Sequence, residues 1–252
     1  MMKWVRKGLA SGIKSTRYPA AAETAPGVSP GRPRATRLAP AAAEELAARC
    51  PSGALTAQSG GIAVAHGRCV HCARCRQGEV TMSWENGYEW AGAEVATLAD
   101  GLARAFGRSL HIRYLDAGAC GACMSEARQL NNPYYNMHRL GFFITATPRT
   151  ADVLLVAGPV TDAMRVALRA TYDAMPEPKR VVAMGACALS GGVFGPSYAA
   201  GTGAAEVVPV DVQVPGCPPP PLALLHALLV VVERKPPQAL GDDPPEAREG
   251  RT

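Results

Sequence analysis

The sequence contains no apolar run long enough to cross a lipid bilayer, which takes about 20 consecutive apolar residues. Its longest apolar run, Leu222 to Val232, is interrupted by His226 and is followed by Glu233. Aromatic residues make up only 6% of the 252 positions, so the chain lacks a stacking platform for single-stranded nucleic acid. We therefore expect a soluble or peripheral protein that binds no nucleic acid.

The first residues, MMKWVRKGLASGIKSTRYP, also lack the uninterrupted apolar segment of a secretory signal. The even count of eight cysteines could otherwise indicate the disulfides of a secreted protein. Without such a signal we expect a reducing compartment, in which thiolates stay available to bind metal. No nucleophile, general base or phosphate loop indicates catalysis, so we expect no complete active site in this chain alone.

Positive charge is concentrated near the N-terminus. Residues 1–49 hold nine Lys or Arg against three Glu, a net charge of +6, so the remaining 203 residues sum to −1. Four apolar residues fall near one side of a helix: Met2, Val5, Leu9 and Ile13. We interpret residues 1–40 as a basic amphipathic arm followed by an extended Pro- and Ala-rich segment. The arm lies on a membrane or partner subunit, or is a frayed basic terminus without function.

Composition then divides the chain into three further parts. Residues 41–92 form a small cysteine-dense module, residues 93–234 alternate strands with helices, and the Pro-rich, charged tail 235–252 is predicted to be disordered. The predicted strands are Gly61–Ala65, Val80–Trp84, Leu110–Leu115, Asp152–Val156, Arg180–Met184 and Val207–Val212. Helical patterns cover Ala93–Phe106, Thr161–Ala174 and Pro221–Val232. The alternation predicts a parallel α/β sheet with right-handed crossovers.

The first cysteine motif is Cys69-Val-His-Cys72-Ala-Arg-Cys75, a C-x2-C-x2-C run. Such a run can wrap three thiolates around one face of a cubane iron–sulfur cluster. In two-cluster ferredoxins a fourth Cys, usually before Pro, follows each run and ligates the other cluster. Cys50-Pro51 is such a fourth position, standing upstream of the run.

Compared with a two-cluster ferredoxin, this sequence lacks cysteine at four ligand positions, and all four would bind the same cluster. Ferredoxin spacing counted back from Cys50 reaches Leu46, Ala43 and Pro40, and counted forward from Cys75 it reaches Glu79. The cysteines that remain form one complete set for a single 4Fe-4S cluster: Cys50, Cys69, Cys72 and Cys75. Zinc or unbound thiols are the alternatives, and His71 is interpreted as a packing or solvated residue rather than a ligand.

The other four cysteines each follow a predicted strand. Cys120-Gly-Ala-Cys123 follows Leu110–Leu115, Cys187 follows Arg180–Met184, and Cys217-Pro218 follows Val207–Val212. Because the carboxyl ends of parallel strands face one crevice, we expect these cysteines to converge there. The alternatives are a thioredoxin-type pair at Cys120 and Cys123, which leaves the other two unexplained, and a zinc site.

Residues 110–232 contain CGAC, TPRTADVLLVAGPVT, VVAMGACALSGGVF and VDVQVPGCPP. This part closely resembles the small, cluster-bearing subunit that complex I shares with membrane-bound energy-converting NiFe hydrogenases, including formate hydrogenlyase. Residues 1–90, with WVRKGLASGIKSTRYP, CPSGAL and GRCVHCARC, are similar to the polyferredoxin-type subunit of those complexes. The chain thus resembles a fusion of two neighbouring subunits.

The resemblance implies a flavodoxin-like domain over residues 93–234, preceded by a ferredoxin-like 4Fe-4S module. It further implies a proximal 4Fe-4S cluster on the second cysteine set, which makes two 4Fe-4S clusters in all. The implied partners are a large subunit of hydrogenase or complex I type, membrane-arm subunits and further ferredoxin-like subunits. The implied location is peripheral, on the cytoplasmic face of the inner membrane, and the implied function is electron relay within an oxidoreductase complex.

Several positions refine this expectation. The C-x2-C spacing at Cys120 and Cys123 is the hydrogenase-side form, whereas complex I uses adjacent cysteines. Met124, His138 and Pro220 replace residues that are usual in the hydrogenase-like members, and Glu126 matches an acidic position. Glu126 is a candidate functional acid or a helix N-terminal carboxylate stabilised by the dipole, and Met124 with the stretch Met137–Phe143 is interpreted as interface packing. The alternative functions are a complex-I-like quinone reductase without NiFe and a zinc-stabilised structural subunit.

Overall fold

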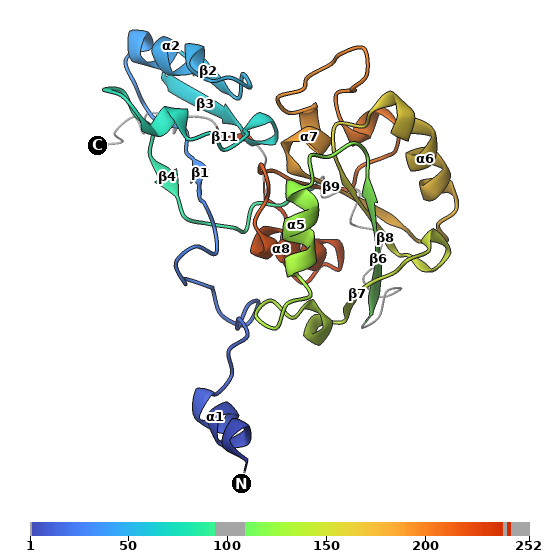
Figure 1. Ribbon diagram of the computed structural model, residues 1–252. Coiled ribbons are helices and arrows are strands. Elements are labelled where there is room, and N and C mark those ends of the chain that lie inside the picture. Colours follow the sequence, from blue (N-terminus) through green and yellow to red (C-terminus); the bar gives the residue numbers. More distant parts are fainter. Residues whose placement is uncertain (1, 94–108, 239–240, 243–252) are drawn as a thin grey trace, which may run out of the picture.

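The computed structural model describes residues 2–93, 109–238 and 241–242. A three-layer α/β domain and a smaller module lie side by side, and the N-terminal helix extends away from both (Figure 1). The helix predicted at Ala93–Phe106 lies, apart from Ala93, outside the described residues.

One six-stranded sheet forms the centre of the larger domain. In spatial order its strands are β5 (Gly92–Ala93), β10 (Val212–Val214), β9 (Arg180–Met184), β8 (Val153–Ala157), β6 (Leu110–Asp116) and β7 (Phe142–Ile144). All neighbours are parallel except β5, which pairs antiparallel with β10. The five parallel strands, numbered along the chain, have the flavodoxin-like order 2-1-3-4-5. The predicted fold class of this domain is confirmed.

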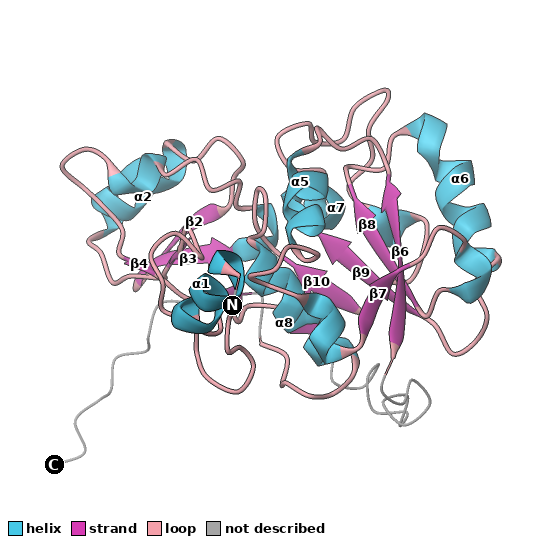
Figure 2. Ribbon diagram, turned by 60° about the horizontal axis from the view of Figure 1, so that its bottom comes forward, coloured by secondary structure: helices cyan, strands magenta, loops and turns pink. Residues whose placement is uncertain are grey.

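Helices cover both faces of this sheet (Figure 2). The core on one face includes residues of α5 (Ala122–Gln129) and α8 (Pro221–Val231), and the core on the other includes residues of α6 (Asp162–Asp173) and α7 (Gly185–Ser190). Every residue of β8 is therefore buried, as expected for a parallel strand with helices on both sides. Short 3-10 turns complete the connections: η3 (Met137–Leu140), η4 (Pro148–Thr150) and η5 (Ala204–Glu206).

Two predicted strands have the wrong bounds. The strand predicted at Val207–Val212 begins only at Val212, because Pro209 has no amide hydrogen to donate to a sheet. The strand predicted at Val80–Trp84 is reduced to β4 (Trp84–Glu85), which pairs with β1 (Arg32–Pro33). The amide of Met82 instead donates to the carbonyl of Cys75 over 2.8 Å, which ties this segment to the cysteine loop.

The smaller module packs α2 (Pro40–Ala48) on the hairpin of β2 (Leu55–Gln58) and β3 (Gly61–Ala65). Its core consists of Ala43, Leu46, Leu55, Ile62, Val64 and Met82. The 3-10 turn η1 (His66–Arg68) precedes the predicted cysteine run, and η2 (Arg74–Arg76) contains its last residue, Cys75. β11 (Gly241–Asp242) pairs with β3, so this part of the segment 235–252 is in a strand, in contrast to the disorder predicted from composition.

The N-terminal arm consists of helix α1 (Lys3–Ser11) and a segment that packs on the larger domain. No residue of α1 is buried, whereas Tyr18 is only 1% exposed and belongs to the core around α8. The Tyr18 hydroxyl shares a 2.7 Å hydrogen bond with Nδ1 of His226, the one polar side chain in the fully buried α8. The segment after α1 is therefore anchored in the core of the larger domain.

Burial lowers the pKa of His226 to about 4 from 6.5, and Glu89 and Lys235 are the charged groups that act on it. We expect the free energy of unfolding to fall as the pH drops from 6.5 toward 4, because the unfolded chain takes up a proton that the folded chain excludes. The loss approaches about 1.4 kcal/mol per pH unit. Denaturant unfolding at pH 7 and pH 5 should show a smaller difference for His226→Asn than for the unmodified chain. An equal pH dependence of the two proteins would contradict this assignment.

Candidate functional site

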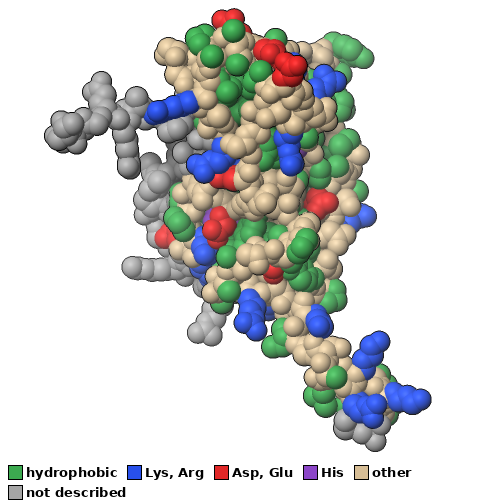
Figure 3. All heavy atoms as spheres, turned by 90° about the vertical axis from the view of Figure 1, so that its left-hand side faces the viewer, with side chains coloured by type: hydrophobic (Ala, Val, Ile, Leu, Met, Phe, Trp, Pro, Cys, Tyr) green, Lys and Arg blue, Asp and Glu red, His purple; other side chains and the backbone are tan. Residues whose placement is uncertain are grey.

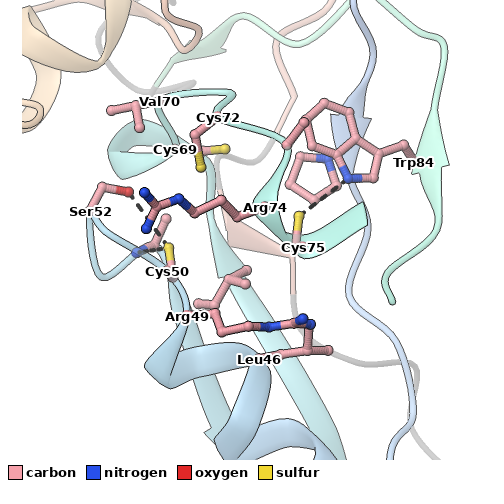
Figure 4. A pocket seen from close by; sticks show the side chains of 14 residues that line it. Leu46, Arg49, Cys50, Ser52, Cys69, Val70, Cys72, Arg74, Cys75 and Trp84 are labelled. Carbon is pink, nitrogen blue, oxygen red and sulfur yellow. Dashed lines mark hydrogen bonds between the residues drawn. The ribbon is translucent and has the colours of Figure 1, made fainter. Parts of the chain in front are cut away.

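The structure brings the first predicted set of cysteines together around one pocket. Cys50 follows α2, and the other three lie on the loop between η1 and the end of η2. Cys50, Cys69, Cys72 and Cys75 all line this pocket, together with Leu46, Arg74 and Trp84 (Figure 4). Cys69 is buried, Cys50 and Cys75 are half-buried, and Cys72 is exposed at the rim.

Hydrogen-bond donors are directed at these sulfur atoms. The amide of Ala54 donates to Sγ of Cys50 over 3.3 Å, and the indole Nε1 of Trp84 donates to Sγ of Cys75 over 3.4 Å. A backbone hydrogen bond from His71 lowers the pKa of Cys69, but burial outweighs it and raises this pKa to about 12. Donors of this kind stabilise thiolates that bind iron or another metal.

The loop carries its cysteines on a tightly wound backbone. His71 and Ala73 both have left-handed conformations, with φ values of 50° and 58°, which are uncommon for residues other than glycine. The ring of His71 lies between Trp84 and Trp90, with centroids 5.9 and 6.2 Å away. The ring of His71 thus packs against both indoles instead of being solvated, and burial lowers its pKa to about 4.

The second set of cysteines lies at the carboxyl ends of three parallel strands. Cys120 and Cys123 follow β6, Cys187 lies in α7 after β9, and Cys217 follows β10. The thiol of Cys123 interacts electrostatically with those of Cys187, Cys217 and Cys120. The predicted convergence of these four side chains therefore occurs.

Two glycines allow the backbone to approach these sulfur atoms. A Cβ atom at Gly185 would lie 2.7 Å from Sγ of Cys123, and one at Gly192 would lie 2.8 Å from Sγ of Cys187. Both glycines have positive φ values, 86° and 60°, which other residues rarely adopt. Burial and neighbouring thiols raise the pKa of Cys123 to about 12 and of Cys187 to about 11. The sites thus bring together thiols whose ionisation is costly until a cation compensates their charge.

The two sets are joined by contacts between their supporting segments. Oγ of Ser190, at the end of α7, donates to the carbonyl of Gly67 in η1 over 3.1 Å. Nε1 of the buried Trp90 donates to the carbonyl of Pro215, close to Cys217, over 3.1 Å. The sequence analysis missed Ser190, Trp84 and Trp90, because no local motif shows which distant backbone groups a side chain will reach.

Other predicted positions have different surroundings from those expected. Glu126 lies beyond the first turn of α5, and burial raises its pKa, the opposite of stabilisation by the helix dipole. In the stretch Met137–Phe143, Met137 and Phe142 are almost completely buried in the core of this chain and so do not pack at an interface, whereas Phe143 is exposed. Met124 is half-buried on α5.

Neither a single-ion metal site nor a membrane-spanning helix is present among the described residues. No group of three or more His, Cys, Asp or Glu side chains there stands close enough to hold a single metal ion. Within the same ranges, none of the helices combines the length and apolarity needed to cross a membrane.

Comparison with known proteins places this architecture in a family. The family described as the NADH ubiquinone oxidoreductase 20 Kd subunit matches residues 120–231, which contain all four cysteines of the second set. The probable membrane-bound hydrogenase subunit mbhJ of Pyrococcus furiosus is 38% identical over 148 residues, which are 59% of this chain and 89% of the relative. The chain belongs to the family of the 20-kDa subunit of NADH–ubiquinone oxidoreductase.

Other members and solved structures are similar over about the same share of the chain. An uncharacterized protein of Methanocaldococcus jannaschii is 42% identical over 127 residues, 50% of this chain and 85% of the relative. A chain of the archaeal membrane-bound sulfane sulfur reductase aligns with a TM-score of 0.47 and 31% identity over 53% of this chain and 75% of its own. A chain of an NAD+-reducing [NiFe]-hydrogenase aligns with a TM-score of 0.43 and 19% identity, over 52% of this chain and 96% of its own.

The contact between Gly185 and Cys123 can be tested by substitution. We expect Gly185→Ala to reduce metal binding at the second cysteine set severely while the first set is unaffected, because the added methyl group would overlap the Cys123 sulfur. Metal content and the spectrum of each site measure the effect. Gly60→Ala is the matched control, since a Cβ atom there meets nothing within 4 Å. Full occupancy of both sites in Gly185→Ala would show that this close approach is not required.

Proposed function

We propose that this chain is an electron-transfer subunit of a membrane-associated oxidoreductase complex. The first cysteine set, in the module 41–92, holds one 4Fe-4S cluster, and the second, in the domain 93–234, holds another. The observation that carries the proposal is that two complete sets of four cysteines converge on adjoining parts of one chain. Such clusters, when bound, supply one-electron transfer without proton or bond changes.

The protein residues bind, polarise and shield these groups. Thiolates of the eight cysteines are the ligands, while Ala54 and Trp84 donate hydrogen bonds to sulfur and Gly185 and Gly192 keep space beside it. Arg74 lines the first pocket, where its positive charge offsets the negative charge of the thiolates. The core around α8 keeps water from one side of the second site.

A partner subunit covers the exposed end of the second site. The loop after α7 contains Gly192, beside Cys187, and exposes Val193, Phe194 and Tyr198, the last of them 97% accessible. Adjacent exposed apolar side chains of this kind are typical of protein interfaces. The family relationship and the name of the Pyrococcus relative support a large subunit of hydrogenase or complex I type as this partner, beside membrane-arm and ferredoxin-like subunits.

A second candidate is a complex-I-like quinone reductase without NiFe, which the description of the matching family favours. Hydrogen uptake or evolution by the purified complex supports the hydrogenase-type function. Quinone reduction without hydrogen turnover supports the second candidate. A zinc-stabilised structural subunit would contain zinc in place of iron and give no EPR signal on reduction.

The number of clusters is a direct test. We expect about eight iron and eight sulfide per copy of the chain, since each cubane holds about four of each. Cys72→Ala should remove one EPR signal of the reduced protein and leave the other, because Cys72 lies at the exposed rim of the first pocket only. Cys217→Ala is the reciprocal variant and should remove the other signal. Four irons in intact protein, or loss of both signals in either variant with the fold retained, would refute the two-site assignment.

We further propose that α1 docks the chain on the cytoplasmic face of the inner membrane. The helix projects from the body of the protein, and Lys and Arg side chains gather on it (Figure 3). Met2, Trp4, Leu9 and Ile13 are all exposed on this arm. A short basic helix with exposed apolar residues gains from anionic lipid surfaces without crossing the bilayer.

Deletion of residues 1–14 should release the complex from membranes and leave both cysteine sites intact, because every cysteine lies beyond Arg49. The deletion stops before Thr16, which is only 3% exposed and whose amide donates to the carbonyl of Tyr134. Flotation with vesicles rich in anionic lipid measures the effect, and Val166→Ser, an exposed apolar change on α6, is the control. High salt alone should release only part of the complex. Unchanged membrane binding after the deletion would make α1 a basic terminus without this role.

A further inference from the structure

Three aromatic rings form a continuous row between the two cysteine sets. The ring of His71 stands edge to face against Trp84 on one side and Trp90 on the other, with centroid separations of 5.9 and 6.2 Å. Both separations are within the range of favourable aromatic pairs. Trp90 is 1% exposed, so the far end of this row lies in the interior of the protein.

One end of the row is hydrogen-bonded to a cysteine of the first site, and the other end is hydrogen-bonded to the backbone near the second site. At the first site, Nε1 of Trp84 donates to Sγ of Cys75 over 3.4 Å. Toward the second site, Nε1 of Trp90 donates to the carbonyl of Pro215 over 3.1 Å, and Gly216 alone separates Pro215 from Cys217. The row therefore connects a ligand of one set to the backbone beside a ligand of the other.

Packing alone does not explain these contacts. The left-handed backbone at His71, with a φ of 50°, places its ring between the two indoles while Cys69 and Cys72 on either side line the pocket. His71 contributes its ring to the row, since its buried Nδ1 has no hydrogen-bond partner among the described residues. The hydrogen bonds at the two ends come from the indoles of Trp84 and Trp90, which an apolar residue could not replace. The guanidinium of Arg32 lies 5.7 Å from the centre of the Trp90 ring and holds its outer face.

We propose that Trp84, His71 and Trp90 form an aromatic bridge that fixes the separation of the two cysteine sites and couples them electronically. This inference rests on the proposed electron-transfer function. One electron passes from the first site to the second or back, no bond forms or breaks, and no ring is oxidised. Electron tunnelling is faster through hydrogen bonds and closely packed groups than through gaps. Trp84, His71 and Trp90 are therefore positioning residues, which favour the transfer without being oxidised or reduced themselves.

A second route between the sites provides an internal comparison. It runs from Cys69 through η1 to Gly67, across the hydrogen bond to Ser190, and back along α7 to Cys187. This route has no aromatic ring and rests on one neutral hydrogen bond. If the aromatic bridge dominates, loss of Trp90 must weaken the coupling more than loss of the Ser190 hydroxyl.

The test compares Trp90→Leu, Trp90→Phe and Ser190→Ala in the intact complex with both sites loaded. We expect Trp90→Leu to keep iron content and both midpoint potentials and to slow intersite transfer after flash reduction. It should also reduce the exchange part of the spin–spin splitting between the two reduced sites, which is transmitted through the intervening groups. Trp90→Phe, which keeps a ring but lacks the donor, should fall between Trp90→Leu and the unmodified protein. Val166→Ala, on the exposed side of α6, should change none of these readouts.

Trp84→Phe probes the other end of the bridge. Because hydrogen bonds to sulfur help to set the potential of an iron–sulfur site, this variant should make the potential of the first site more negative and leave the second unchanged. Unchanged splitting and transfer rate in Trp90→Leu, or a larger loss in Ser190→Ala, would overturn the bridge. If Trp90→Leu fails to retain its metal, the spin–spin splitting and the transfer rate of Trp90→Phe test the bridge in its place. Absence of two iron–sulfur sites in the unmodified protein would instead refute the proposed function.

Discussion

The structure depends on keeping groups of four thiols together in surroundings that disfavour their charge. Burial is the largest cause of the raised pKa values of Cys69, Cys75, Cys123, Cys187 and Cys217, and neighbouring thiols add to it. A bound cation would therefore provide much of the stabilisation of each site, and the protein would have to hold the sulfur atoms in place until it binds. The rigid elements around each set serve this requirement.

The two sites meet the same requirement with different local structures. In the first, a short loop with left-handed residues carries three cysteines, and α2 brings the fourth to the same pocket. In the second, the parallel sheet itself aligns the ends of β6, β9 and β10, so that residues about a hundred positions apart become neighbours. The first site can be recognised from its motif, whereas the second requires the fold to be inferred first.

The same distinction between local patterns and long-range contacts determines which helices, strands and contacts could be predicted from the sequence. Buried strands such as Arg180–Met184 were predicted correctly because, after the arginine, every residue is apolar and buried, as expected for a strand with helices on both faces. The helix α7 was not predicted, and α5 was expected only as the helix N-terminus considered for Glu126, because both helices are short and begin beside glycines that carry no periodic pattern. The contacts of Trp90 and Ser190 could not be predicted, because their acceptors are backbone carbonyls more than a hundred residues away along the chain.

Segments near the two ends of the chain also hold the small module and the larger domain together. Tyr18, which precedes the small module, is buried in the core of the larger domain, and β11, which follows that domain, pairs with β3 of the module. Each part thus completes the other, so their relative position does not depend on a single linker. A fixed arrangement matters more for electron transfer than for most binding functions, because tunnelling falls steeply with distance. The exchange of terminal segments, together with the Ser190 and Trp90 contacts, is a physical reason for joining the two parts in one chain.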